Sequence, residues 1–211
     1  MEHRKILQTS IIPLPDQRQV IIEGPIDPDK LAALTIHSSL HAFRRPNEQH
    51  EALIEIAQLP EGRIIAVIEE NTLVGYVTFH YPDELERWST AKMNDLIELG
   101  AIEIATEYRS YGIGKRAIQL AFAEQQLDNA IVFATEYYWH WDLDGTKLNV
   151  WDYRKMMERL MQTVGMTWHA TDDPEICSHP ANCLMVRIGP EVPMSSIEQF
   201  DQLRFQRRFM Y

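Results

Sequence analysis

The sequence predicts a mixed α/β fold, in which a central sheet of about six to seven strands is flanked by about four helices. Two observations lead to this class. Short runs rich in β-branched residues alternate along the chain with longer segments whose apolar residues recur at helical spacing. The 211 residues, 45% hydrophobic and 24% charged, have the composition of a globular protein and are too few for two large domains.

The first half of the chain predicts one strand, two helices and a hairpin. Residues 19–23 form a β-branched run, and Asp27 followed by Pro28 is typical of a helix N-cap and its first helical residue. Apolar residues at helical spacing extend this first helix to Phe43. The remaining expected elements are a helix over 46–58 and hairpin strands over 63–69 and 73–80.

The second half predicts a strand that leads through a turn into a helix, followed by further strands and one more helix. The strand, 96–105, is mostly apolar but contains Glu98 and Glu103. The glycine-bearing turn 109–115 then opens a helix that ends near Phe122. The other expected elements are strands over 130–135, 166–170 and 183–188 and a helix over 150–164.

We expect three parts: an N-terminal segment over 1–18, a single domain over 19–190 and a C-terminal helical tail over 191–211. The tail ends in an Arg-rich and aromatic tip, 204–211, on a chain whose formal net charge is −11. Because this is a local reversal of charge, the tip could pack on the acidic domain or contact a partner protein.

Composition excludes several classes of function. A net charge of −11 disfavours nucleic acid and anionic membranes as partners, and no run approaches the roughly 18 apolar residues of a membrane span. Two cysteines, Cys177 and Cys183, make no disulfide framework and predict reduced thiols in a cytoplasmic protein. Together with His179 they lack the paired spacing of zinc ligands, so we predict no metal.

The turn 109–115, R-S-Y-G-I-G-K, is the segment that most clearly indicates chemistry. Gly112 and Gly114 would let a ligand approach the backbone closely. The N–H groups of residues 111–115 would be unpaired donors at the start of a helix, where an anion such as a pyrophosphate binds. Arg109 and Lys115 add positive charge. The alternative is that the glycines only shape a turn, because such short patterns recur by chance.

Two common nucleotide motifs are absent. The chain lacks the P-loop pattern, and a dinucleotide fingerprint would need a glycine where Ala117 stands. The turn therefore indicates a pyrophosphate site outside those two folds.

The strand I-E-I-A-T-E-Y followed by R-x-x-G-x-G resembles motif A of the GNAT acetyltransferases, and the order of elements over about 20–188 resembles the GNAT fold. The resemblance implies an N-acetyltransferase with acetyl-CoA as co-substrate. It also implies that the amides of the turn bind the pyrophosphate of coenzyme A and that the preceding strand pairs with the pantetheine arm. The cofactor-binding residues that it assigns are Ile102, Glu103, Ile104, Arg109, Ser110, Tyr111, Gly112, Ile113, Gly114 and Lys115.

Further runs along the chain resemble one branch of this family, which acts in the acetoin and acetate metabolism of bacilli. Among them are Y-P-D-x-L-E-R-W-S, T-E-Y-Y-W-H-W-D-L and S-H-P-A-N-C-L-M. This resemblance implies a protein lysine acetyltransferase. Its implied partner and substrate is acetyl-CoA synthetase, which is inactivated when its active-site lysine is acetylated.

The chemistry requires a base. A lysine ammonium, with a pKa of about 10.4, must lose a proton before it attacks a thioester, and a shielded carboxylate can take that proton. Glu98 and Glu103 are the candidates. Glu98 stands 11 residues before Arg109, the offset of the base glutamate in the histone-acetylating members, and is our first choice. Either carboxylate could instead be a solvated group at a strand end.

The acid that protonates the departing thiolate is less defined. Many members of the family use a tyrosine where this chain has Met161. Tyr138 is our candidate, with Tyr137 and Tyr153 as substitutes, and each could instead be a packing residue. The aromatic segment 137–141 could flank the acetyl-transfer tunnel, form a docking surface or pack in the core.

Two other functions stay open. The acidic chain could attract a small amine such as a polyamine as acceptor. It could also be a non-catalytic, acyl-CoA-sensing module that inhibits a partner by binding it. The sequence does not fix the oligomeric state, and a homodimer is one option.

Overall fold

The computed structural model describes residues 3–206. These residues form two compact units. The first unit comprises residues 3–80 and 99–126, and the second comprises residues 81–98 and 127–206. Strand β6, Leu96–Ile104, passes from the second unit into the first after Glu98. Because strands and helices combine in both units, the predicted mixed α/β class is confirmed.

The first unit is built on a largely antiparallel sheet. Strand β1 pairs with β2, β2 with β4, and β4 with β5, all antiparallel, while the short β3 pairs with β5 in parallel. Residues 99–104 of β6 lie next to β5. The elements are β1 (Gln8–Pro13), β2 (Gln19–Gly24), α1 (Pro28–Ala32), β3 (Thr35–Ile36), α2 (Pro46–Gln58), β4 (Arg63–Glu69), β5 (Thr72–His80) and α3 (Ile113–Ala121).

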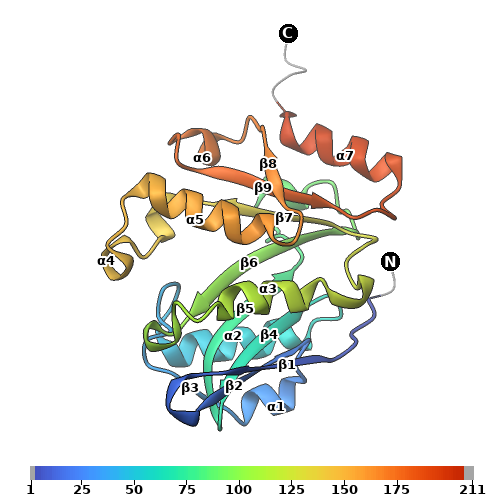
Figure 1. Ribbon diagram of the computed structural model, residues 1–211. Coiled ribbons are helices and arrows are strands. Elements are labelled where there is room, and N and C mark those ends of the chain that lie inside the picture. The colour runs from blue at the N-terminus through green and yellow to red at the C-terminus, as the bar shows by residue number, and fades with distance from the viewer. Residues whose placement is uncertain (1–2, 207–211) are drawn as a thin grey trace. The chain divides into compact units, whose positions relative to one another are not determined.

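Two helices pack on this sheet (Figure 1). Helix α2 contacts β4 and β5, and α3 contacts β1, β2, β4 and β5. Residues 63–68 of β4 are all buried, so both faces of that strand are covered. The packing holds α3 against the sheet, and the predicted anion-binding turn lies at the N-terminal end of this helix.

The first predicted helix is wrong beyond Ala32. Helix α1 ends there, and Thr35–Ile36 forms β3, in which the N–H of Thr35 donates to the carbonyl oxygen of Asn71 (3.0 Å). Thr35 and Ile36 are both β-branched, which favours a strand, and they pair with β5. Leu40 is fully buried outside any helix, so the apolar spacing reflected loop residues that face the core.

Strand β1 has no counterpart among the predicted elements, since it falls in the expected N-terminal segment. All six of its residues pair with β2. Half-buried and exposed positions alternate along it, as in an edge strand, and Gln8, Thr9 and Ser10 interrupt any apolar run. Its pairing makes residues 8–13 part of the sheet of the first unit.

The second unit combines parallel and antiparallel pairing. Residues 96–98 of β6 pair with β7 in parallel, β7 pairs with β9 antiparallel, and β9 pairs with β8 antiparallel. Trp88, Leu96, Phe133 and Phe200 lie in its buried apolar core. The elements are β7 (Ile131–Glu136), α4 (Leu143–Thr146), α5 (Val150–Gln162), β8 (Thr167–His169), α6 (Pro174–Cys177), β9 (Cys183–Ile188) and α7 (Met194–Arg204).

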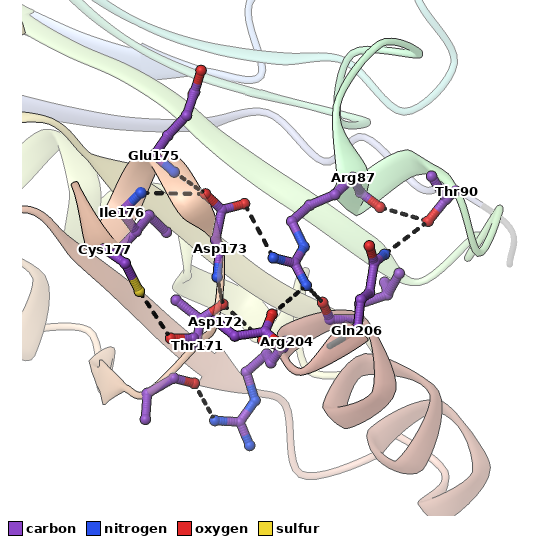
Figure 2. A network of polar contacts seen from close by, with 12 residues as sticks. Arg87, Thr90, Thr171, Asp172, Asp173, Glu175, Ile176, Cys177, Arg204 and Gln206 are labelled. Carbon is purple, nitrogen blue, oxygen red and sulfur yellow. Dashed lines mark hydrogen bonds and ion pairs between the residues drawn. The ribbon is translucent and has the colours of Figure 1, made fainter. Parts of the chain in front are cut away.

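A polar network holds the end of α7 (Figure 2). The Nη2 atom of Arg87 donates to Asp172 Oδ1 (2.7 Å) and to the carbonyl oxygen of Leu203 (2.6 Å). The N–H of Asp172 donates in turn to the carbonyl oxygen of Arg204 (2.9 Å). The last turn of α7 is therefore tied to two loops of its own unit.

Arg204 belongs to the tip predicted to pack on the domain or contact a partner. Its guanidinium donates to Asp201 and to the carbonyl oxygen of Ala170 (2.9 Å), so these contacts lie within the second unit. Residues 207–211 of the tip lie outside the described part of the chain.

Candidate active site

The turn that follows β6 has an unusual backbone. Ser110 and Gly112 have positive φ values, 71° and 72°, in the left-handed region that favours glycine. Gly112 is the N-cap of α3, which begins at Ile113. The Nε–H of Arg109 donates to the carbonyl oxygen of Ile104 (3.0 Å), which ties the turn to the end of the strand.

The turn presents a row of unpaired donors. Within residues 3–206, the backbone N–H groups of residues 111–115 have no hydrogen-bond partner. The first paired N–H belongs to Arg116, which donates to the carbonyl oxygen of Gly112 (3.0 Å). Exposed Lys115 adds positive charge at the same end of the helix. Several convergent N–H donors at a helix N-terminus fit a group that carries phosphate oxygens.

The glycines of the turn leave open space. A Cβ on Gly112 would meet nothing within 4 Å, and one on Gly114 would meet only Ile104 Cγ1, at an ordinary 3.7 Å. The positive φ at residue 112 explains why a glycine occupies that position. Packing within the protein does not explain Gly114, so its missing side chain suits close approach of a ligand.

The two candidate bases on β6 have different surroundings. Glu103 is 4% exposed, and both of its carboxylate oxygens accept hydrogen bonds, from the N–H of Ala42 (2.8 Å) and the hydroxyl of Tyr76 (2.5 Å). Burial raises the pKa of Tyr76, and the Glu103 carboxylate raises it further, so the phenol stays protonated and donates. Glu103 therefore joins β6 to two other segments of the first unit.

Glu98 is 8% exposed, and its carboxylate has no hydrogen bond or ion pair within the described residues. Burial raises the pKa of its carboxyl from an ordinary 4.5 to about 8, and the negative charges of Glu86 and Asp83 contribute to the shift. Its neighbour across the sheet is Phe133, the last residue of β7 that pairs with β6. Such a carboxyl can exchange a proton near neutral pH.

The aromatic segment 137–141 belongs to the second unit. The ring of Tyr138 packs against that of His179 in a tilted arrangement, with centroids 4.2 Å apart, and the N–H of Tyr138 donates to Asn182 Oδ1 (3.0 Å). Tyr153 stacks on Trp141, with centroids 5.2 Å apart. Tyr138 and Tyr153, two of the three candidate proton donors, thus contribute to packing.

Tyr137 packs against the apolar core of the second unit and stacks on Trp139, with centroids 4.8 Å apart. Burial raises the pKa of Tyr137, while a hydrogen bond with the Thr135 side chain opposes that shift.

The sequence analysis did not identify two further carboxyl groups with raised pKa values, those of Glu136 and Glu86. Burial raises the pKa of Glu136, at the end of β7, to about 7, although a hydrogen bond from Trp141 Nε1 (2.8 Å) partly opposes this. Partial desolvation raises the pKa of Glu86, with smaller contributions from Asp83, Glu175 and Asp173. The only sequence signal for Glu136 was an acid at the end of a buried β-strand.

The site residues fall into two groups, one in each unit. The first unit brings together Ile102, Glu103, Ile104 and the turn 109–115. The second unit contains the aromatic segment 137–141 and Glu98, whose carboxyl interacts electrostatically with Glu86 and Asp83.

Two further observations concern ligands and membranes. Within residues 3–206, no group of three or more His, Cys, Asp or Glu side chains is arranged to hold a metal ion; Cys183 is buried in β9, whereas Cys177 is exposed. None of the helices in the described part of the chain has the length and apolar character needed to span a bilayer.

Residues 33–140 match the Acetyltransferase (GNAT) family. This match covers the β6 strand and the turn with its row of free amides. The chain belongs to the GNAT family, has the GNAT fold and is an acetyl-transferring enzyme. The co-substrate of that family is acetyl-CoA.

Three relatives are similar along almost their whole length. The chain is 56% identical to the acetoin utilization protein AcuA of Bacillus subtilis strain 168, with 100% of both chains covered. It is also 56% identical to AcuA of Bacillus licheniformis, over 99% of this chain and 97% of that one. The crystal structure of an acetoin utilization protein from Exiguobacterium sibiricum matches with a TM-score of 0.95 and 48% identity, over 99% and 98% of the two chains.

Proposed function

We propose that this enzyme transfers the acetyl group of acetyl-CoA to a lysine of acetyl-CoA synthetase and thereby inactivates that partner, as part of acetoin utilization. Full-length identity of 56% to two acetoin utilization proteins supports the metabolic setting. The resemblance of its sequence motifs to the lysine-acetylating branch of the family supports the partner.

The observation that carries the donor half of the proposal is the row of unpaired N–H groups at 111–115. These amides bind the pyrophosphate of the donor, and Arg109 and Lys115 add charge there. Gly114 gives the phosphates room, since no protein atom needs the space that its side chain would fill. Ile102 and Ile104 contact the pantetheine arm.

Glu98 is the general base in this proposal. Its carboxyl, with a pKa of about 8, is a stronger base than an ordinary glutamate and is ionised in part of the population at neutral pH. It takes one proton from the acceptor ammonium, which leaves a neutral amine as nucleophile. Glu103, whose two oxygens already accept hydrogen bonds, has a positioning role on β6 instead.

The proton donor stays a prediction. Tyr138 contacts His179 through its ring and Asn182 through its backbone N–H, and neither contact involves its hydroxyl. A coenzyme A thiolate is a tolerable leaving group, so the reaction does not depend on a strong acid.

The experiment is incubation with acetyl-CoA and purified acetyl-CoA synthetase, followed by mass spectrometry of tryptic peptides and an assay of synthetase activity. The expected result is one acetylated lysine and a parallel loss of synthetase activity. A panel of free polyamines, run under the same conditions, tests the small-amine alternative. Acetylated polyamine with an unmodified synthetase would contradict the proposed substrate.

A further inference from the structure

A cavity of about 380 Å³ lies within the second unit, apart from the turn 109–115. Three separate loops and one end of the described chain form its walls. The lining residues are Leu85, Glu86, Arg87, Trp88, Tyr137, Asp173, Pro174, Glu175 and Gln206.

The described residues that line the cavity carry net negative charge. Their single cation, Arg87, is paired with Asp172 (2.7 Å) and lies 3.6 Å from Asp173 (Figure 2). Glu86 and Glu175 have no ion pair within the described residues. Two carboxylates are therefore left to attract a cation.

The buried base candidate faces the same side of the sheet as this cavity. Glu98 is paired in register with Phe133, and directly paired residues project from the same face. The ring of Phe133 lies 5.2 Å from that of Trp88, which lines the cavity. Glu98 is more than nine-tenths buried and has no hydrogen-bond partner among the described residues, so its carboxyl is free to accept a proton from a ligand on this face.

The apolar walls suit an alkyl chain. Leu85 is 97% exposed, and together with exposed Pro174 and half-buried Tyr137 it gives an apolar surface beside the two carboxylates; Trp88 also lines the cavity but is 2% exposed. A lysine side chain combines an apolar stem with a cationic head, and an aromatic ring beside the head favours its charge.

We propose that this cavity is the acceptor site and that Glu86 and Glu175 select an alkylammonium group, such as the side chain of lysine. The two carboxylates bind the cation by charge, and the apolar walls hold its stem. This inference rests on the proposed function, in which Glu98 then removes the proton from the bound ammonium. Glu86 and Glu175 determine specificity and take no proton themselves.

The test uses the full-length enzyme and a peptide with a single lysine and a blocked N-terminus. Steady-state kinetics compare wild type with the double variant Glu86→Gln/Glu175→Gln. The single variants Glu86→Gln and Glu175→Gln are measured as well. Their matched control is Glu84→Gln, which likewise removes one charge from an exposed position, in the same loop as Glu86 but outside the cavity lining. Thermal melting of each variant checks folding, and calorimetry measures acetyl-CoA binding.

At pH 9, where Glu98 is mostly ionised in wild type and variant alike, the expected result is a rise in KM for the peptide of roughly tenfold in the double variant, with kcat within about twofold and acetyl-CoA affinity unchanged. Glu84→Gln should leave KM near the wild-type value. n-Butylamine, a probe with the same head and stem, should compete with the peptide in wild type and do so more weakly in the double variant.

An unchanged KM in the folded double variant, or an equal rise in Glu84→Gln, would overturn the inference while the acetyl transfer itself stood. The failure of wild type to acetylate any alkylammonium acceptor, despite binding acetyl-CoA, would instead refute the proposed function. The two failures are therefore distinguishable.

Discussion

Two glutamates five positions apart on β6 have different hydrogen-bonding surroundings. The carboxylate oxygens of Glu103 accept hydrogen bonds from the N–H of Ala42 and the hydroxyl of Tyr76. Glu98 is equally buried but lacks any such partner among the described residues, and its pKa rises to about 8. The two glutamates therefore differ in hydrogen bonding rather than in burial, and this difference distinguishes Glu103, the positioning residue, from Glu98, the proposed base.

The first prediction concerns the rate of Glu98→Gln. Loss of the base should lower kcat by about 100-fold, while acetyl-CoA binding measured by calorimetry stays unchanged. In wild type, kcat/KM should rise with pH through about 8, because Glu98 acts only when it is ionised. A variant with wild-type kcat, or with the same inflection near pH 8, would rule Glu98 out as the base.

The second prediction concerns stability. Because the folded-state pKa of Glu98 is raised from 4.5 to about 8, the folded protein holds a proton that the unfolded chain releases between these values. The free energy of unfolding of wild type therefore falls as pH rises through this window. At pH 9, Glu98→Gln should be more stable than wild type by on the order of 3 kcal/mol, and at pH 4 the two should be similar.

Glu103→Gln is the matched control for that experiment. A Gln side chain would present an NH₂ group to one of the two donors, so this variant should lose about 1–3 kcal/mol at neutral pH. Urea unfolding at several pH values measures both effects. Equal destabilisation of the two variants at pH 9 would contradict the distinction drawn between these carboxyls.

Sequence analysis identified both glutamates and favoured Glu98 from its offset to Arg109, but it could not reveal which carboxylate is already hydrogen-bonded. The contacts that decide are made by Ala42, 61 residues away, and Tyr76, 27 residues away. The same holds for Glu86, whose significance depends on loops that come together only in the folded unit. Long-range packing of this kind leaves no local pattern to detect.

At the scale of elements, the segment from β6 through the turn to α3 was predictable because its signal is local. A strand, two glycines and an amphipathic helix follow one another directly, and the structure contains them in that order. Strands β1 and β3 were not predictable in the same way. Their pairing depends on the edges offered by β2 and β5, which periodicity within β1 or β3 does not reveal.

The third prediction tests the start of α3. Gly114 has an ordinary φ and room for a Cβ, so Gly114→Ala should keep or slightly raise stability, by about 0.5 kcal/mol. The added methyl would occupy the space assigned to phosphate and should weaken acetyl-CoA binding by about tenfold or more, measured by calorimetry. Unchanged affinity in the folded variant would show that the ligand does not approach this glycine.

The fourth prediction tests the anchor of α7. Arg87→Met keeps an apolar stem but removes the donors to Asp172 and Leu203. Two acceptors would lose their partner, so stability should fall by about 2–3 kcal/mol. Amide hydrogen exchange should quicken across Met194–Arg204 and stay slow in β4. Unaltered exchange in α7 would show that the other contacts of the helix, among them the packing of Phe200 and the bond from the Asp172 N–H to Arg204, hold it without Arg87.

At the scale of the whole molecule, the two chemical tasks are carried by different units. The first unit carries the free amides of 111–115, and the second carries Glu98 and the acidic cavity. Strand β6 belongs to both, so a single continuous strand connects the proposed base to the turn. The cationic groups at the turn attract the anionic donor. The acidic residues elsewhere, which give the chain its net charge of −11, favour a cationic acceptor.

The most direct test of the account is a titration of ¹⁵N-labelled enzyme with coenzyme A, followed by amide NMR. The account predicts that the amide signals of residues 111–115 move most and become protected from exchange with solvent, and that pantetheine, which lacks the pyrophosphate, leaves them in place. Signals of 111–115 that stay unmoved at saturating coenzyme A, while other regions respond, would contradict it.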